Sequence, residues 1–303
     1  MKTFKIPFDA MACHCEIVLE CTDETAAYKL AQGAIMEVQR IEYRYSRYRP
    51  DSIISQINAA AGRSFVACDD ETWALLNYAD HLYETSDGLF DITAGVLRQV
   101  WNFNDAQLPS KQRLAQICEL ISWSSVERQQ QQIRLPQVGM ELDFGGFGKE
   151  YAADKAAAQL TTVGVEHGYV NLGGDLRVIG PKPDGQAWMM GIQDPRDKTK
   201  LVASIPIKQG ALATSGDYQR YFDIAGKRYC HILDPHTGQP VDYWRSVSVI
   251  APLAIMAGNY STITMLKQSA GLDFLEASNL SYLAIDHQGK IHMNSEVKHH
   301  DKC

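Results

Sequence analysis

Short runs of β-branched and aromatic residues, separated by glycine, proline and aspartate, fill residues 168–250 and constrain the fold more than any other feature of the sequence. Runs of this length and composition between turn-forming residues are typical of β-strands. We therefore predict six strands in this block, at residues 169–172, 176–179, 187–192, 201–207, 221–224 and 246–250.

Helical patterning flanks this block on both sides. Thr22 or Asp23 can cap a long helix in which apolar residues recur every three or four positions, and Pro50 lies just beyond its expected end. The spacing of apolar residues predicts further helices at 70–85, 149–160, 255–266 and 272–277. A strand pair is expected within residues 4–20 and a last strand at 282–285.

This order of elements predicts an α+β fold. Helices come early, strands follow as a block and helices return, which differs from the strict alternation of a parallel sheet. No internal repeat, low-complexity tract or long linker interrupts the 303 residues. We therefore expect one continuous domain over residues 1–303, with a central, mostly antiparallel sheet flanked by helices.

Charge and hydropathy exclude several classes of partner. The net charge of −7 argues against binding of double-stranded nucleic acid, which normally requires a basic face. No apolar run reaches the length of a transmembrane helix, so we expect no membrane span, and no signal peptide is visible at the start. Seven scattered cysteines without a signal peptide indicate reduced thiols and a cytoplasmic location.

Cys13 and Cys15, with His14 between them, could suggest a metal site. We expect the side chains of a strand to alternate between its two faces, so that one ion could not easily reach both sulfurs. The prediction is therefore that these are small strand residues and that the chain holds no redox-active cysteine pair.

Four segments carry residue types suited to chemistry. Residues 142–149 combine an aspartate with three glycines before a predicted helix, where N–H groups can bind an anion, although a tight structural turn explains the pattern equally well. The Gly-Gly step in residues 170–179 is a hairpin signal that needs no ligand. Residues 213–218 hold small hydroxylated side chains beside an aspartate. In residues 231–238 a histidine precedes an Asp-Pro turn, where an imidazole and a carboxylate could transfer protons.

Together with two earlier segments, these four resemble the FAD:protein FMN transferase family, also called the ApbE family. The earlier segments are residues 48–58, which begin Tyr48-Arg49-Pro50-Asp51-Ser52, and residues 86–91, which read Ser86-Asp87-Gly88-Leu89-Phe90-Asp91. The resemblance extends from residue 11 to residue 285. Each segment alone is common, and the order and spacing of all six make the match specific.

The resemblance implies an FAD-using, magnesium-dependent transferase. Members of the family pass the FMN half of FAD to a threonine or serine hydroxyl of a target flavoprotein and release AMP. By its place in the family motif, His231 is the expected base that takes the proton from that hydroxyl. The positions that match the family's FAD contacts are Met11, Tyr48, Leu89, Phe90, Asp91, Gly145, Tyr151 and Ile232.

Two of these positions have side chains with an evident use. Tyr48 is suited to stacking on an aromatic ring of the ligand, and Asp91 to pairing with its polar edges. Ordinary core packing is the alternative for Tyr48, Phe90 and Tyr151.

The metal site that the resemblance implies is altered in this chain. Its ligands would be the backbone carbonyl of Gly148 and the hydroxyl of Thr262, with Ser261 beside it, but Gly258 stands where the family has an aspartate. Magnesium prefers oxygen ligands, and glycine offers no side chain. Asn259, next to Gly258, would point about 100° around the helix, which makes a simple replacement doubtful.

Two milder departures accompany this one. Met11-Ala12-Cys13 replaces the Met-Gly-Thr usual in the family, and Glu150 stands where a glycine is common.

Three outcomes of the change at position 258 are open. The enzyme works with weaker metal affinity through Thr262, Ser261 and water; another carboxylate, Glu150 or Asp234, takes over; or the chain binds FAD without catalysis. Slow hydrolysis of FAD to FMN and AMP is a further alternative in the same site. A redox flavoenzyme is less favoured, because no pyridine-nucleotide fingerprint is present.

Overall fold

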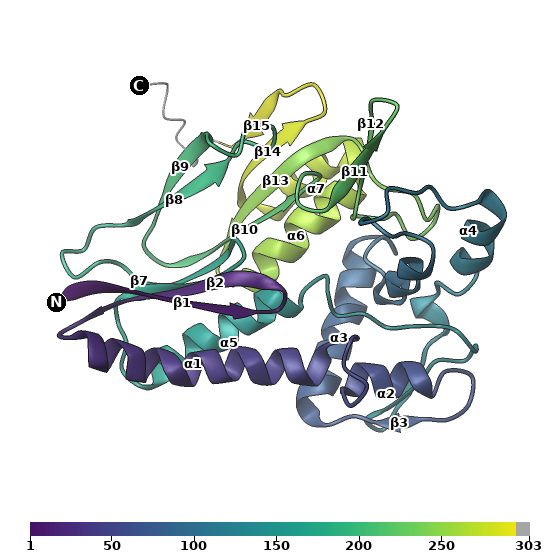
Figure 1. Cartoon of the computed structure of the whole chain (residues 1–303), viewed down its shortest axis with the longest axis horizontal. Helices are drawn as coiled ribbons and strands as arrows, with labels where there is room; N and C mark the ends of the chain where they lie inside the picture. Colours follow the sequence, from purple (N-terminus) through teal and green to yellow (C-terminus); the bar gives the residue numbers. More distant parts are fainter. Residues whose placement is uncertain (295–303) are drawn as a thin grey trace.

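The structure, a computed structural model, describes residues 1–294 and is built around an antiparallel sheet of eight strands (Figure 1). Every neighbouring pair in this sheet is antiparallel. The predicted α+β fold with a central antiparallel sheet is therefore confirmed. In order across the sheet, the strands are β1 (Lys2–Ala10), β2 (Cys13–Cys21), β6 (Gly168–Leu172), β7 (Asp175–Gly180), β10 (Gly210–Gly216), β13 (Trp244–Ala251), β14 (Ser281–Asp286) and β15 (Ile291–Met293).

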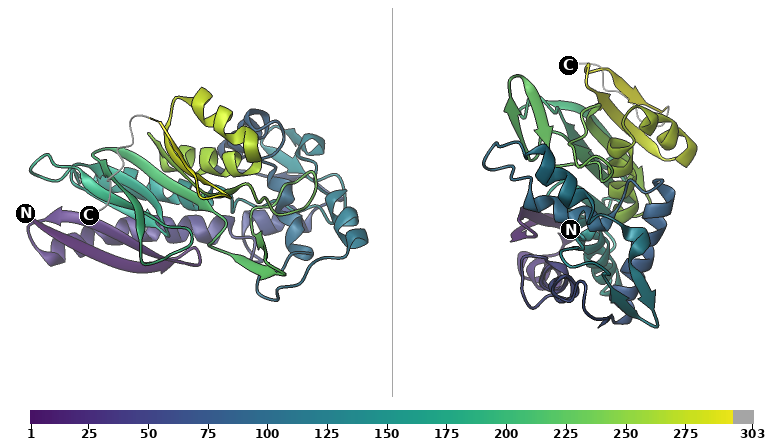
Figure 2. Two further views of the ribbon diagram at one scale, coloured as in Figure 1. Left: turned by 90° about the horizontal axis from the view of Figure 1, so that it is seen from above. Right: turned by 90° about the vertical axis from the view of Figure 1, so that its right-hand side faces the viewer.

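Helices cover one face of this sheet. α1 (Glu24–Tyr45) begins at Asp23, whose carboxylate accepts a hydrogen bond from the N–H of Ala26, so the predicted cap is confirmed. α1 lies beside the β1–β2 hairpin along the length of the molecule (Figure 2). α5 (Gly148–Thr162) packs on α1 and β7, and α6 (Ala254–Leu266) packs on α5, β10 and β13. Within residues 1–294, no helix combines the length and apolar character needed to cross a membrane.

A separate hairpin, β8 (Trp188–Gln193) with β9 (Leu201–Ile207), shares a second hydrophobic core with the other face of the sheet. Along β14, Tyr282 and Ala284 join the core beneath the helices, whereas Leu283 and Ile285 join the core beneath this hairpin. Alternating strand side chains thus give the sheet two apolar faces. The strands predicted near 187–192 and 201–207 form, but they lie outside the central sheet.

The strand predicted at 221–224 also lies outside the central sheet. It is β11 (Tyr221–Ile224), paired only with β12 (Lys227–Cys230) among the described strands. Phe222 of this ribbon packs with Trp101, with a 3₁₀-helix, η1 (Ile92–Gln99), and with α4 (Lys111–Cys118) in a third apolar cluster. The β11–β12 ribbon, which directly precedes the histidine segment, is therefore anchored to η1 and α4 by this cluster.

Long elements were predicted more accurately than short ones. α3 (Asp70–Thr85) has the predicted bounds, and α7 (Gly271–Ser278) lies within a residue of its prediction at each end. Several short elements were not predicted, because too few residues are present to show a period. They are α2 (Ile53–Ala59), α4, the 3₁₀-helices η1, η2 (Trp123–Ser125) and η3 (Gln268–Ala270), and the small sheet of β3 (Val66–Ala67), β5 (Gln132–Arg134) and β4 (Glu127–Gln129).

Cys13 and Cys15 are strand residues as predicted, but the reason given, that their side chains lie on opposite faces, is wrong. Cys13 and Cys15 lie two residues apart on β2, and residues two apart share a face of a strand. Their sulfur atoms are 3.6 Å apart. The alternation rule separates each cysteine from His14 and brings the two sulfurs together.

Candidate functional site

The glycine loop connects two buried phenylalanines to the start of α5. The Phe144 and Phe147 ring centroids lie 4.8 Å apart, and the N–H of Gly148 donates to the carbonyl oxygen of Phe144 at 2.7 Å. A Cβ at Gly146 would lie 2.9 Å from the Phe90 ring, so a larger residue would displace that ring. Phe147, which precedes α5, supplies no side-chain cap. Because the N–H of Gly148 is already paired with Phe144, the next N–H groups of α5, those of Lys149 and Glu150, are the ones placed as an anion site requires.

Asp143 joins this loop to the segment that contains Tyr48. Its Oδ2 lies 2.7 Å from Nη1 of Arg47, and its Oδ1 accepts a hydrogen bond from the N–H of Gly145 at 3.0 Å. Tyr48 is 75% exposed, and its ring centroid lies 5.2 Å from the Arg47 guanidinium. Core packing is thus excluded for Tyr48, whose ring is accessible to a planar ligand.

The segment from Leu89 to Asp91 supports the loop from its buried side. Phe90 is 6% exposed and stacks on Phe147, so core packing accounts for its side chain. Asp91 accepts hydrogen bonds from the N–H and hydroxyl of Thr93 at 2.7 and 2.6 Å and from the N–H of Trp123 at 3.0 Å. Burial raises the pKa of Asp91. These bonds give Asp91 a structural role, and its contact with a ligand stays a prediction.

His231 directly follows β12 and keeps one ring nitrogen unused. Its Nδ1 is buried and has no hydrogen-bond partner among the described residues. Burial lowers the pKa of His231 to about 4, and the positive charges of Arg220 and Lys149 act in the same direction. The imidazole is therefore neutral at pH 7 and able to accept a proton. Ile232, the next residue, is buried in the main core.

Lys149 connects the glycine loop to the second glycine motif. Its Nζ lies 2.6 Å from Oδ2 of Asp175, a buried carboxylate at the start of β7. Gly173 and Gly174 have φ of +65° and +105° in the turn that precedes Asp175, which confirms the predicted hairpin. Neither Lys149 nor Asp175 was predicted to be a site residue. The sequence signal for both residues was their position, because each directly follows the last glycine of a glycine motif.

Three hydroxyl groups meet where β10 faces α6. Oγ of Ser215 lies 2.7 Å from Oγ of Ser261 and 2.9 Å from Oγ1 of Thr262. Ser261 also donates to the carbonyl oxygen of Gly258 at 2.8 Å. Ser261 and Thr262 were predicted as site residues. Ser215 was noted only as part of the hydroxyl-rich motif, and the structure adds it to this cluster.

Glu150 fills the space that a side chain at position 258 would occupy. A Cβ on Gly258 would lie 2.5 Å from Oε1 and 2.6 Å from Cγ of Glu150, which is 6% exposed. Its Oε2 is buried and has no hydrogen-bond partner within residues 1–294. Burial raises the pKa of Glu150 to about 8, and the charge of Asp175 acts in the same direction. A carboxyl group therefore lies against α6 one helical turn before Thr262.

Of the other two candidates, Asp234 is engaged within its own turn, whereas Asn259 is engaged only through its amide nitrogen and keeps its Oδ1 buried without a partner in residues 1–294. The side-chain amide of Asn259 donates to the hydroxyl of Tyr78 at 2.9 Å. Asp234 accepts a hydrogen bond from the N–H of His236 at 2.8 Å, within its own turn. Glu150 is thus the carboxylate that the structure places at this position.

These residues fit a hard cation such as magnesium. In the described part of the chain, no group of three or more His, Cys, Asp and Glu side chains could hold a metal ion. A site here must therefore combine a carboxylate with hydroxyl and backbone oxygens, which Mg²⁺ accepts readily together with water. The unpartnered Oε2 of Glu150 is the observation that fits, because a buried carboxylate oxygen needs a partner.

Two remaining predicted contacts lie at the edges of the site. Met11 occupies the turn between β1 and β2, with φ of +51°, and packs against the main core. The hydroxyl of Tyr151 donates to Oε1 of Glu71 on α3 at 2.7 Å. That bond and its packing explain Tyr151, so ligand contact by either residue stays a prediction.

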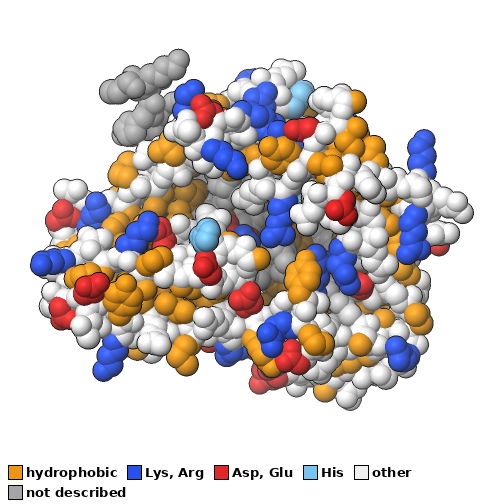
Figure 3. All heavy atoms as spheres, in the orientation of Figure 1, with side chains coloured by type: hydrophobic (Ala, Val, Ile, Leu, Met, Phe, Trp, Pro, Cys, Tyr) orange, Lys and Arg blue, Asp and Glu red, His pale blue; other side chains and the backbone are white. Residues whose placement is uncertain are grey.

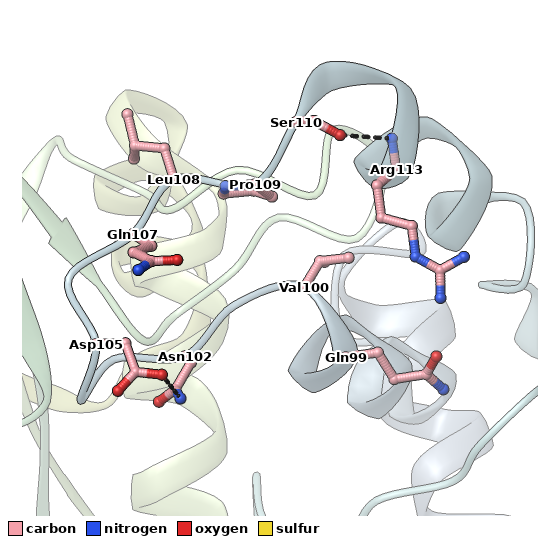
Figure 4. Close-up of a pocket in the computed structure, with 9 residues that line it drawn as sticks. All are labelled: Gln99, Val100, Asn102, Asp105, Gln107, Leu108, Pro109, Ser110 and Arg113. Atoms are coloured by element: carbon pink, nitrogen blue, oxygen red, sulfur yellow. Dashed lines mark hydrogen bonds between the residues drawn. The ribbon is translucent and has the colours of Figure 1, made fainter.

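Two hollows are visible on the surface. The face in Figure 3 is hollowed near its centre, with Lys and Arg side chains near the rim. A second, open hollow lies between η1 and α4 (Figure 4) and contains none of the predicted site residues. It is lined by Gln99, Val100, Asn102, Asp105, Gln107, Leu108, Pro109, Ser110 and Arg113.

Similarity to known proteins covers most of the chain. The family model described as the ApbE family matches residues 11–284. A protein of Treponema pallidum named FAD:protein FMN transferase is 31% identical over 272 residues, which cover 78% of this chain and 74% of the relative. A protein of the same name from Haemophilus influenzae is 28% identical over 261 residues, which cover 81% and 75%.

Solved structures show the same relationship. The crystal structure of the ApbE protein of Thermotoga maritima aligns with a TM-score of 0.88 at 30% identity and covers 97% of both chains. The apo form of the Pseudomonas stutzeri flavinyl transferase ApbE aligns with a TM-score of 0.84 at 26% identity, covering 97% of this chain and 95% of the other. On these matches the chain belongs to the ApbE family, and the relatives from Treponema pallidum and Haemophilus influenzae are named as transferases.

Proposed function

We propose that this chain is an FAD:protein FMN transferase, which moves FMN from FAD to a threonine or serine hydroxyl of a target flavoprotein and releases AMP. The observation that carries the proposal is His231, a neutral imidazole with an unpartnered Nδ1 whose pKa is lowered in part by Lys149 of the glycine-loop helix. The names of the related proteins support the same activity.

The proposed reaction assigns one task to each group. The acceptor hydroxyl oxygen forms a bond to the phosphorus of the FMN half of FAD, the bond from that phosphorus to the bridging oxygen breaks, and AMP leaves with the electron pair. His231 takes the hydroxyl proton, because a neutral hydroxyl is a weak nucleophile. The ammonium of Lys149 and the N–H groups of residues 149 and 150 in α5 are suited to binding the phosphates.

We propose Glu150 as the carboxylate of the metal site, in place of an aspartate at position 258. The ion would be held by Glu150, by the hydroxyls of Thr262 and Ser261, and by the backbone carbonyl of Gly148. When bound, magnesium neutralises negative charge that develops on phosphoryl oxygens. The support is the position of Glu150, whose Oε1 lies 2.5 Å from the point where the Cβ of residue 258 would be.

The second candidate is an FAD-binding protein without transferase activity. The observation that favours it is Gly258 itself, since α6 carries no carboxylate at that position. The presence of Glu150 in the same space weakens this alternative. Slow FAD pyrophosphatase activity, with water in place of the protein hydroxyl, is the intermediate case. A cytoplasmic location stays a prediction.

The test uses the whole chain with FAD, MgCl₂ and a flavoprotein domain that carries an acceptor threonine. We expect flavin fluorescence that remains on the acceptor after denaturation, with one AMP released per flavin attached. The controls are His231→Ala and an acceptor with valine in place of its threonine. Binding of FAD without AMP, in Mg²⁺ and in Mn²⁺, would refute the proposal in favour of the non-catalytic protein. AMP and free FMN without attached flavin would indicate hydrolysis.

A further inference from the structure

Two cysteine sulfurs are in contact at the start of β2. Cys13 is the first residue of the strand, Cys15 lies on the same face, and their Sγ atoms are 3.6 Å apart. Cys13 is half-buried, whereas Cys15 is 3% exposed. The pair therefore consists of one thiol that a small molecule can reach and one thiol held directly behind it.

The surroundings make the two thiols unequal. The hydrogen bond from Cys15 lowers the pKa of Cys13 to about 7, and the charge of Lys149 acts in the same direction. The same hydrogen bond, together with burial, raises the pKa of Cys15. An accessible thiolate beside a second thiol is the arrangement found in thiol-exchange sites.

The other described cysteines have neither a lowered pKa nor a neighbouring sulfur. Burial raises the pKa of Cys21, Cys68, Cys118 and Cys230, and no second sulfur contacts any of them within residues 1–294. Cys118 provides the closest comparison, because it is half-buried like Cys13.

We propose that Cys13 and Cys15 form a reactive dithiol that exchanges with low-molecular-weight disulfides and closes to an intramolecular disulfide. The Cys13 thiolate attacks one sulfur of a disulfide RSSR, so that a mixed disulfide forms and RS⁻ leaves. Cys15 gives its proton to solvent and attacks Sγ of Cys13, and the second RS⁻ leaves. The two protein thiols are oxidised, RSSR is reduced to two thiols, and two electrons are transferred.

Closure needs a local movement of the backbone, because strand residues two apart have Cα atoms about 6.6 Å apart, close to the upper limit for a disulfide. A disulfide needs the sulfurs to approach from 3.6 Å to about 2 Å. Cys13 pairs with Ala10 in the last strand pair before the two-residue turn, so its backbone is restrained by strand pairing on one side only. The test of this proposal measures thiol chemistry alone, so its result does not depend on flavin transfer.

The experiment exposes the whole protein to glutathione disulfide at pH 7, stops exchange with acid and measures intact and peptide masses. Wild type should lose two hydrogen atoms at the peptide that contains both cysteines and keep no adduct. Cys15→Ser should keep one glutathione on Cys13, because the serine hydroxyl still donates a hydrogen bond but cannot resolve the adduct. Cys13→Ser should form neither product, and Cys118→Ser should behave as wild type.

A second measurement needs no substitution. In wild type, alkylation of Cys13 by iodoacetamide at pH 7 should be faster than that of Cys118, because the pKa of Cys13 is lowered and burial raises the pKa of Cys118. Wild type that keeps a stable glutathione adduct, or equal alkylation of Cys13 and Cys118, would overturn the proposal.

Discussion

An aspartate introduced at position 258 is expected to destabilise this protein, because Glu150 already occupies the space. A Cβ on residue 258 would lie 2.5 Å from Oε1 and 2.6 Å from Cγ of Glu150, closer than non-bonded atoms approach. Rotation of the carboxylate end alone would not relieve the contact with Cγ. Gly258→Asp therefore requires Glu150 to leave its place, whereas the exchange of both residues, Glu150→Gly with Gly258→Asp, moves one carboxylate from α5 to α6.

Two effects set the size of the loss. Overpacking a buried position costs about 1–3 kcal/mol. Two ionised carboxylates about 4 Å apart would repel each other by about 4 kcal/mol at an effective dielectric constant of 20. The raised pKa of Glu150, about 8, limits this repulsion because the group can remain protonated at pH 7. We expect a net loss of about 3 kcal/mol, which corresponds to a fall in Tm of about 5 °C for a chain of this length.

The matched controls separate packing from charge. Gly258→Ala adds the clash without a carboxylate, and its better helix propensity, about 1 kcal/mol, offsets part of the cost. The exchange variant should recover most of the stability lost by Gly258→Asp, which gives a favourable coupling free energy of about 2 kcal/mol in a double-mutant cycle. Glu150→Gly alone is the fourth corner of that cycle.

Thermal unfolding and calorimetric binding of Mn²⁺ in the presence of FAD are the two assays. We expect Glu150→Gly to lose Mn²⁺ affinity and the exchange variant to regain it, independently of any transfer activity. The reasoning is refuted if Gly258→Asp is as stable as wild type and binds Mn²⁺ more tightly. It is equally refuted if Glu150→Gly binds the ion as wild type does, since Glu150 would then not be a ligand.

Further predictions concern His231, Lys149 and Tyr48. His231→Gln should reduce flavin transfer by about 10²–10⁴-fold, measured as AMP release, with little change in the Kd of FAD. Because folding lowers the pKa of His231 from 6.5 to about 4, the unfolded chain binds its proton more tightly. The free energy of unfolding in urea should therefore fall as the pH decreases from 6.5 towards 4, less so in His231→Gln, and equal slopes would contradict this. Lys149→Ala should cost about 3–5 kcal/mol in thermal unfolding, because Asp175 stays buried without its cation, and Lys149→Ala with Asp175→Ala should regain part of that loss. Tyr48→Ala should leave Tm nearly unchanged but raise the Kd of FAD about 2- to 10-fold, and an unchanged Kd would exclude stacking.

The sequence predicted elements whose residues repeat a period many times. α1 and α3 are long enough for their buried faces to be identified without the structure, and Asp23 was one of the two residues expected to cap α1. The β6–β7 hairpin was predicted from its Gly-Gly step, because left-handed backbone at two successive positions favours glycine. The predicted His231 and the hydroxyls of Thr262 and Ser261 are in chemically suitable surroundings in the structure.

Contacts between distant segments were not predictable from local pattern. The β8–β9 hairpin has the same alternation as central strands, and only tertiary packing places it outside the main sheet. Ser215 carried a hydroxyl in a recognised motif, but its role depends on α6 lying beside β10. For Cys13 and Cys15 the sequence contained the necessary information. A strand has a period of two residues, which places both sulfurs on one face, and the prediction applied this period incorrectly.

Glu150 and Gly258 are explained only when the two residues are considered together. Taken singly, Gly258 is a missing ligand, and Glu150 is a buried carboxyl group whose Oε2 has no partner in residues 1–294. Burying a carboxyl group without a hydrogen-bond partner lowers the free energy of unfolding, and a small residue at position 150 would avoid that loss. A ligand bound by the carboxyl group would offset it. Oε1 of Glu150 lies 2.5 Å from the point where the Cβ of residue 258 would be. The space beside position 258 therefore still contains one carboxyl group, supplied by α5. The absent aspartate therefore does not by itself exclude catalysis, and the unpartnered oxygen of Glu150 supports the proposed cation site.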